Sequence, residues 1–310
     1  MQYRIENITI TITIDKSLHK RTLAALFERF MITPKTQQRL FADHAVRIND
    51  AAAESPDALL QSGDTVCLVQ KEEDVDWPAS DTLAEVVWRN AFLIAVHKPA
   101  GRIIHSEGYG TDCLNADVAA WLLQQNIHTP VRPLHRLDKD TEGLVLYSLV
   151  PLFQPWFDNA LKEHRIRRCY LALCKGNCTE GKKMTIRKPI GKDRHVNGKY
   201  RVSATGKEAC TQAECLYSHN GFSLMRCILE TGRTHQIRVH LSDAGYPIVN
   251  DPLYGISTHA YEGMGLWAYV SRYAIPSPAR SIRSKTAMSL PGGSNSPYQT
   301  AKRKYNRTNR

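Results

Sequence analysis

Residues 132–143 read RPLHRLDKDTEG and come directly before an apolar run, LVLY, at residues 144–147. The apolar run predicts a strand, and the polar stretch before it predicts a loop at the edge of that strand. The loop contains the carboxylate of Asp138, with the cations of Arg132 and Arg136 on its N-terminal side. A nearby positive charge favours the ionised form of a carboxyl group. We therefore expect Asp138 to act as a nucleophile or a general base.

A second polar cluster lies further along the chain, where residues 230–241 read ETGRTHQIRVHL. It continues into GYPIVNDPLYG at residues 245–255, which has the composition of turns. The histidines of the cluster raise the question of a metal site. His235 and His240 are five residues apart, no cysteine accompanies them, and the chain has no His-Glu-x-x-His pattern. We therefore predict no metal site.

Together, the segments HRLDKDTEG and GRTHQIRVHL resemble the two signature motifs of the RluA family of pseudouridine synthases. Three further segments resemble motifs of the same family and occur in the expected order: LIAVHKPAG, RRCYLALCKG and GYPIVNDPLYG. The resemblance covers residues 85–291. It implies an enzyme that isomerises uridine to pseudouridine in RNA, and it implies the pseudouridine synthase fold.

The resemblance also implies a mechanism without a metal or an organic cofactor. Asp138 is the implied nucleophile, and it attacks the target nucleotide either at C1′ of the sugar or at C6 of the uracil. The uracil is released from its N-glycosidic bond, rotated and rejoined through C5. Because the bond that breaks and the bond that forms belong to one substrate, no further reagent is needed.

Three substrate-binding residues follow from the same resemblance. Arg238 is implied to pair with Asp138 through a bidentate contact that keeps it charged and oriented. Tyr170 is implied to stack on the extruded uracil, near the C5 proton. Arg136 would fill the vacated place in the base stack with its planar guanidinium. The chain departs from the family pattern at Glu142, where the family has serine, and at Trp267, where it has histidine.

A small unit precedes these motifs. Isoleucines at positions 8, 10, 12 and 14 alternate with other residues as in a strand with one buried face, and Thr22 begins an amphipathic helical pattern. Thr33-Pro34 predicts the start of a second helix, which contains Lys35 and Arg39. Short strands should follow. The pattern resembles the S4 RNA-binding domain, which implies that Lys35 and Arg39 contact RNA.

We therefore expect an α+β protein with a mixed, largely antiparallel sheet in its catalytic domain. The predicted divisions are an S4-like domain at residues 1–75, a linker at 76–84, the catalytic domain at 85–291 and a basic, disordered tail at 292–310. The linker prediction rests on the acidic, proline-containing composition of KEEDVDWPASDT at residues 71–82. The tail prediction rests on Gly, Ser, Asn and basic residues with almost nothing apolar.

The charge distribution points to RNA as the partner. The chain has 310 residues and a formal net charge of +11, and residues 279–310 contain 8 Lys and Arg but no Asp or Glu. Residues 161–207 contain 14 Lys and Arg against 3 Asp and Glu. Such stretches bind phosphates by releasing condensed cations. The choice of RNA comes from the family resemblance instead: the S4-like domain implies ribosomal RNA of the large subunit as the substrate, with tRNA as the alternative.

The beginning of the sequence does not resemble a secretion signal, and no window approaches 18 uninterrupted apolar residues. We expect a cytoplasmic monomer with no membrane partner, whose eight cysteines are reduced. Three other functions agree less well with the sequence. A catalytically silent RNA-binding protein would not need Asp138, Tyr170 and Arg238. A glycosidase using Asp138 with Asp140 lacks other carbohydrate-binding features, and a nuclease would need clustered carboxylates for a divalent metal.

Overall fold

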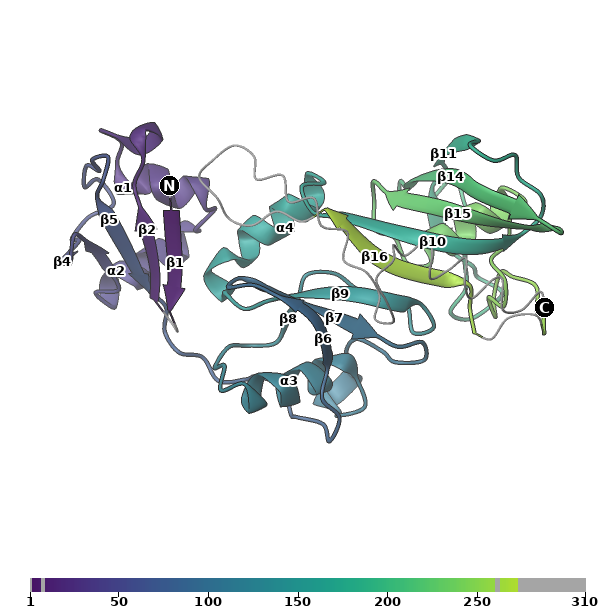
Figure 1. Ribbon diagram of the computed structural model, residues 1–310, viewed down its shortest axis with the longest axis horizontal. Coiled ribbons are helices and arrows are strands. Elements are labelled where there is room, and N and C mark those ends of the chain that lie inside the picture. Colours follow the sequence, from purple (N-terminus) through teal and green to yellow (C-terminus); the bar gives the residue numbers. More distant parts are fainter. Residues whose placement is uncertain (1, 7–8, 260–262, 273–310) are drawn as a thin grey trace.

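The protein is described from a computed structural model, which defines residues 2–6, 9–259 and 263–272. Two sheets organise the chain. A small sheet lies in residues 2–69 and a large one extends from residue 85 to residue 272. Figure 1 shows the small sheet at the purple end of the molecule and the large sheet across its middle and its green end. The predicted tail at residues 292–310 lies outside the described residues.

The first unit, residues 2–69, is named the N-terminal unit here. Its five strands pair in the order β1-β2-β5-β3-β4. Its elements are β1 (Gln2–Glu6), β2 (Thr9–Thr13), the 3₁₀ turn η1 (Lys16–Leu18), α1 (Leu23–Arg29), α2 (Pro34–Ala42), β3 (Val46–Ile48), β4 (Ala51–Ala52) and β5 (Thr65–Val69).

Local sequence signals explain the elements of this unit. Ile10 and Ile12 are fully buried, as the alternation in β2 predicts. The helix predicted from Thr33-Pro34 is α2, and the Thr33 hydroxyl accepts a hydrogen bond from the backbone N–H of Thr36 at 3.3 Å. Between β3 and β4, Asn49 and Asp50 both have positive φ angles, of 50° and 68°. Such angles suit a tight hairpin turn, which asparagine and aspartate tolerate.

The large sheet has nine strands, paired in the order β11-β14-β15-β10-β16-β9-β7-β6, with β8 paired to β9. Its strands are β6 (Glu85–Arg89), β7 (Leu93–Lys98), β8 (Arg132–Pro133), β9 (Glu142–Ser148), β10 (Arg167–Lys175), β11 (Lys183–Arg187), β14 (Cys210–His219), β15 (Phe222–Leu229) and β16 (Leu266–Arg272). A separate hairpin is formed by β12 (Ile190–Lys192) and β13 (Tyr200–Val202). Neighbouring strands are antiparallel except β16 and β9, which are parallel. The predicted fold class is therefore confirmed.

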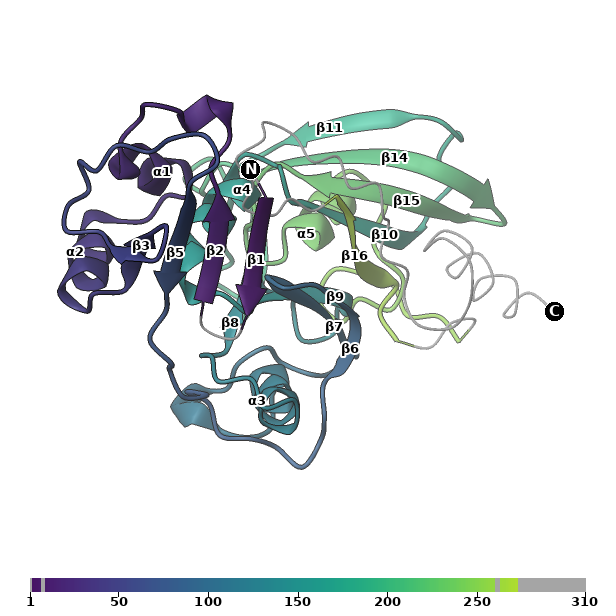
Figure 2. The ribbon, with the colours of Figure 1, turned by 60° about the vertical axis from the view of Figure 1, so that its left-hand side comes forward.

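Helices accompany this sheet, and strand alternation gives it two apolar faces. The helices are α3 (Leu114–Gln124), α4 (Gln154–Lys162) and α5 (Gln236–Asp243), with 3₁₀ turns η2 (Glu107–Tyr109) and η3 (Pro151–Phe153). Val145 and Tyr170 belong to the buried cluster that includes residues of α3 and α5. Leu146 and Leu171 point the other way, into the cluster that includes residues of α4. Figures 1 and 2 show α3 and α4 on opposite sides of β7 and β9.

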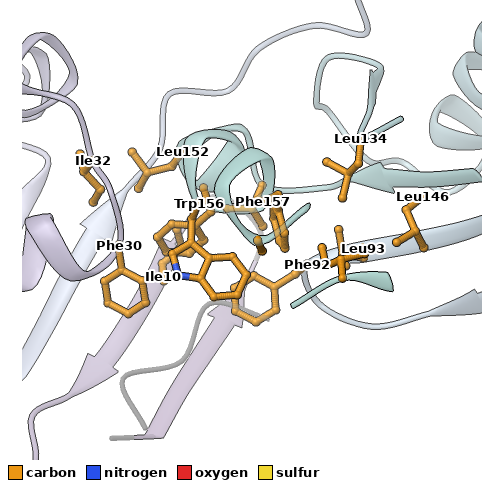
Figure 3. Packing of buried hydrophobic residues seen from close by; sticks show 14 of the residues in the cluster. Ile10, Phe30, Ile32, Phe92, Leu93, Leu134, Leu146, Leu152, Trp156 and Phe157 are labelled. Atoms are coloured by element: carbon orange, nitrogen blue, oxygen red, sulfur yellow. The ribbon is translucent and has the colours of Figure 1, made fainter. Parts of the chain in front are cut away.

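The N-terminal unit belongs to the same apolar cluster as α4. The rings of Phe30 and Phe153 have centroids 5.1 Å apart, and Phe153 in turn lies 5.8 Å from Phe92, at the start of the β7 region. The side chain of Gln70 accepts a hydrogen bond from the backbone N–H of Leu152 at 3.2 Å. Figure 3 shows Phe30 and Ile10 facing the α4 region. The N-terminal unit and the large sheet are therefore joined by a continuous core.

Candidate active site

Asp138 lies in the loop between β8 and β9, as predicted, near the middle of the large sheet. Its side chain is 26% exposed, so it is open to a ligand without being fully solvated. A turn shapes the loop, because the backbone N–H of Thr141 donates to the carbonyl of Asp138 at 3.1 Å. Arg136, two residues earlier, is exposed. The loop therefore presents a partly exposed carboxylate and an exposed guanidinium two residues apart.

A buried lysine holds this loop in place. Lys98 is 0% exposed, and its ammonium group donates to the carbonyls of Pro99, Arg102 and Lys139 at 2.7–2.8 Å. The backbone N–H of Gly101 also donates to the carbonyl of Lys139 at 3.0 Å. Burial lowers the pKa of Lys98 to about 8, against the raising effect of nearby carboxylates, so the group is still charged at pH 7. The charged, fully bonded ammonium links the Lys98-Pro99 turn to the loop of Asp138.

Arg238, on α5, reaches the same carboxylate. Its Nη1 donates to Oδ2 of Asp138 at 3.2 Å. The expectation of a bidentate contact with Asp138 was wrong, because the two parallel hydrogen bonds go to Asp251 instead, at 2.7 and 2.9 Å. Asp251 is itself fixed by the backbone N–H groups of Leu253 and Tyr254. Its buried carboxylate therefore orients the guanidinium, and the remaining nitrogen points at Asp138.

The surroundings of Arg238 favour its charged form. Burial disfavours the charged form of Arg238, but the hydrogen bonds and charge of Asp251, together with the charge of Asp138, outweigh burial and raise its pKa. The Arg238 side chain is only 4% exposed and that of Asp251 is 0% exposed. Since a buried charge without a partner is very costly, these two groups depend on each other.

His235 approaches Asp138 from the start of α5. It has a left-handed backbone conformation, with φ of 56°, and its Nε2 lies 3.9 Å from Oδ2 of Asp138. Burial lowers the pKa of His235, so the ring is neutral at pH 7. The hydroxyl of Tyr254 accepts from the backbone N–H of Tyr200 at 2.7 Å and lies 2.9 Å from Nδ1 of His235. It can therefore donate to Nδ1, which leaves the Nε2 proton facing Asp138.

Tyr170 lies on β10 and is 5% exposed. Burial raises the pKa of its hydroxyl to about 12, so the group is protonated at neutral pH. Within the part of the chain that the structure describes, this hydroxyl makes no hydrogen bond. It lines the same cavity as Asp138, which leaves an aromatic ring with a free donor beside the carboxylate.

Two hollows meet at Asp138. The first is about 500 Å³ and is also lined by Tyr170, Arg168 and Arg238. The second is about 370 Å³ and is lined by Lys139 and Thr234, among others. Asp138, Arg136, His235 and Arg233 line both hollows. Both hollows are lined by cations, and the first alone is also lined by the ring of Tyr170.

Lys35 and Arg39 are exposed on α2, in the N-terminal unit. Figures 1 and 2 both show α2 well apart from β10 and β16. The structure therefore brings Asp138, Arg136, Tyr170 and Arg238 to one site, and it places the two N-terminal cations elsewhere. Among the described residues, no cluster of His, Cys, Asp or Glu has the make-up of a metal site, and no helix there is long and apolar enough to cross a membrane.

Sequence reasoning did not single out Asp251, His235, Tyr254 or Lys98 as parts of the site. Each lies within a segment that carried the resemblance, so position in a motif was the available signal. Trp267, one of the two residues that depart from the family pattern, lies on β16. It is 4% exposed and belongs to the buried cluster that includes residues of α4. It is therefore a core residue.

Comparison with known proteins decides the family. Residues 92–243 match the family model described as RNA pseudouridylate synthase. The chain is 32% identical over 245 residues to RNA pseudouridine synthase YlyB of Bacillus subtilis, which covers 77% of this chain and 80% of that protein. The chain belongs to the RNA pseudouridylate synthase family. The RNA pseudouridine synthase YhcT of the same organism is 35% identical over 205 residues, which is 64% of this chain and 66% of that relative.

Other relatives and solved structures agree with this family. Ribosomal large subunit pseudouridine synthase D of Neisseria meningitidis is 32% identical over 220 residues, 69% of this chain. The match spans only 58% of that relative's length. The solved structure of human RNA pseudouridylate synthase domain containing 1 superposes with a TM-score of 0.53 at 24% identity, covering 69% of this chain and 86% of that one. At that identity the superposition shows the pseudouridine synthase fold alone.

One residue in which this synthase departs from the family pattern has a structural partner. Glu142 accepts from Nε2 of His97 at 3.3 Å, and Glu85 accepts from Nδ1 of the same ring at 2.7 Å. The hydrogen bond with Glu142 is the largest cause of a raised pKa at His97, and Glu85 adds to it, while burial opposes it. A ring that donates from both nitrogens carries a positive charge, so His97 offsets the acid that Glu142 places beside the loop.

Glu142→Gln is therefore expected to lower stability in a pH-dependent way. A raised folded-state pKa at His97 gives stability that is fully present below the unfolded value of about 6.5 and is lost as the pH rises through the folded value. The difference in Tm between wild type and Glu142→Gln should be largest at pH 6 and should shrink by pH 9, as measured by thermal unfolding. The exposed Glu107→Gln serves as the control. A difference that grows with pH would contradict this assignment.

Proposed function

We propose that this pseudouridine synthase isomerises uridine to pseudouridine in ribosomal RNA of the large subunit, with Asp138 as the nucleophile. The observation that carries the proposal is the position of Asp138 at the junction of two hollows, in contact with Arg238 and beside Tyr170. Relatives named as large-subunit pseudouridine synthases support the choice of RNA. tRNA is the alternative substrate.

The chemistry requires the target nucleotide to leave its helix, because a base within the stack cannot reach a carboxylate in a cavity. The uracil enters the hollow of about 500 Å³ and stacks on the Tyr170 ring. The exposed guanidinium of Arg136 takes the vacated place in the stack. Arg238 holds Asp138 aimed at the nucleotide, either at C1′ or at C6. In both routes the base separates from C1′ through N1 and is rejoined through C5.

The remaining parts of the chain have supporting roles in this proposal. Residues 1–75 act as an S4-like RNA-binding domain, in which the exposed Lys35 and Arg39 contact phosphates. Residues 76–84 connect it to a catalytic domain at 85–291. The enzyme acts as a monomer in this proposal. The large-subunit RNA named for its relatives suits a cytoplasmic enzyme.

In vitro transcripts of large-subunit ribosomal RNA and of tRNA, incubated with the purified protein, provide the test. Chemical mapping of pseudouridine should find conversion at one or a few uridines of the ribosomal transcript. Pseudouridine formation in the tRNA transcript alone would show that tRNA, and not ribosomal RNA, is the substrate. Binding of both RNAs without any pseudouridine would instead favour a catalytically silent RNA-binding protein, and would refute the proposed activity.

A further inference from the structure

The base-receiving hollow contains a cation that the mechanism above does not use. Arg168 lies on β10 two residues before Tyr170, so strand alternation places both side chains on one face. Both line the hollow of about 500 Å³. Arg168 is only partly exposed, and within the described residues its guanidinium makes no hydrogen bond or ion pair. A partly exposed guanidinium without a protein acceptor is hydrated, and a ligand with oxygen acceptors that enters the hollow can replace that water.

A glycine lies beside the guanidinium of Arg168. Gly232 lies directly against the guanidinium, and a Cβ at that position would come within 3.1 Å of its Nη1. A side chain at this position would require the guanidinium to shift by a few tenths of an ångström. Gly232 also lines the hollow, just before the segment that carries His235 and Arg238. The guanidinium of Arg168 thus lies on the wall of the same hollow as the ring of Tyr170.

The charge of Arg168 reaches its neighbours. Burial is the main cause that lowers the pKa of His135 to about 3, and the charge of Arg168 is the second. His135 is therefore neutral and does not compete for an anion. The charge of Arg168 also opposes the effect of burial on the Tyr170 hydroxyl. Arg238, in contrast, is committed to Asp251 and Asp138. Negative charge that develops near Tyr170 would therefore meet Arg168.

We propose that Arg168 binds one carbonyl oxygen of the uracil that stacks on Tyr170, and stabilises the negative charge that this oxygen acquires when the base leaves C1′. This inference rests on the proposed function and names a further catalytic residue for it. A guanidinium can present two parallel N–H groups to oxygen acceptors, and its planar fork is rigid. Fixed donors in a cavity that excludes water stabilise a developing anion more strongly than water does.

The electron balance shows why such a group is needed. When a carboxylate oxygen of Asp138 bonds to C1′, the C1′–N1 bond breaks and its electron pair passes to the base, where it spreads over N1, O2 and O4. C5 then bonds to C1′, the ester to Asp138 breaks and regenerates the carboxylate, C5 loses a proton and N1 gains one. Attack at C6 instead opens the C5=C6 double bond and places its electron pair on O4; after the C1′–N1 bond breaks, C5 bonds to C1′, C5 loses its proton, N1 gains one, and the carboxylate leaves C6 as the double bond is restored. In both routes a cation at a carbonyl oxygen stabilises the charge.

Arg168→Met is expected to lower kcat by about 100-fold with little change in the affinity for RNA. Arg168→Lys, which keeps the charge but loses the fork, should recover part of this loss. The control is Arg167→Met, which removes an exposed cation from the same strand that does not line the hollow. Single-turnover rates and RNA binding measured at two salt concentrations separate catalysis from phosphate contact.

A substrate with 5-fluorouridine at the target position tests the charge directly. Fluorine withdraws electrons and makes the uracil a better leaving group, so the variant should lose less on this substrate, measured as the rate at which the fluorinated nucleotide reacts. An equal loss on both substrates would overturn the role in charge stabilisation. A loss of affinity that changes with salt would assign Arg168 to an RNA phosphate instead.

Thermal unfolding shows whether the variants are folded, and Arg168→Lys keeps the test open if Arg168→Met unfolds. If both variants turn over as fast as an active wild type, the proposed role of Arg168 is refuted while the proposed function stands. A wild-type protein that makes no pseudouridine in any RNA would refute the proposed function, and this inference with it.

Discussion

Asp138→Asn is expected to abolish pseudouridine formation while the fold and the binding of RNA persist. The amide has nearly the same shape as the carboxylate but is not a nucleophile, and loss of a nucleophile typically costs about four orders of magnitude or more in kcat. Arg238 loses one contact with a charged partner and keeps its two hydrogen bonds to Asp251, so the surrounding structure should hold.

The measurement is the release of tritium from RNA labelled at C5 of uridine, since C5 must lose its proton when it bonds to C1′. Asp140→Asn is the matched control, because it changes a second partly exposed carboxylate in the same loop. It should retain most of the activity. Wild-type turnover by Asp138→Asn would contradict the nucleophile assignment, and an equal loss in both variants would point to a carboxylate pair.

Arg238→Met is expected to reduce both stability and activity. The change leaves the carboxylate of Asp251 charged and fully buried with no cation beside it. Breaking a buried ion pair by removal of one partner costs about 3–5 kcal/mol of unfolding free energy. Urea denaturation should detect this loss. Activity should fall as well, because Asp138 loses the guanidinium nitrogen that contacts it at 3.2 Å.

A second substitution separates these two effects. Asp251→Asn, combined with Arg238→Met, removes the stranded charge, and its amide oxygen can still accept from the backbone N–H groups of Leu253 and Tyr254. The double variant should recover much of the stability and none of the activity. A single variant as stable as wild type would contradict the buried pair. Recovery of activity in the double variant would contradict a role for Arg238 at Asp138.

Local sequence signals predicted the parts of this structure that depend on neighbouring residues. The Thr33-Pro34 helix start, the alternation in β2 and the loop before β9 all reflect interactions within a few residues, and the structure has them. The features that the sequence did not reveal depend on contacts between residues far apart in the chain. The composition of residues 71–82, for example, does not reveal that Asp76 accepts a hydrogen bond from the backbone of Val131 at 2.8 Å, or that the neighbouring Gln70 accepts one from the backbone of Leu152.

The site shows the same division. Asp138 and Arg238 were paired from motifs, but competition between acceptors decides the geometry, and no local pattern reveals that Asp251 is the better placed of two carboxylates. The burial of Lys98 is another example. Its sequence suggests an exposed turn, and only the approach of the carbonyls of Arg102 and Lys139 makes a buried ammonium tolerable.

The core that joins the N-terminal unit to α4 affects how RNA would bind. Swinging the unit away would expose Phe30, Phe92 and Phe153, and exposing one such side chain costs about 1.5–3 kcal/mol. The separated arrangement is therefore rare. If α2 contacts RNA as proposed, the free-energy cost of fixing its position relative to Asp138 is met when the protein folds and not when RNA binds. An RNA held at one surface then meets the other at a high effective concentration, with no loss of interdomain freedom on binding.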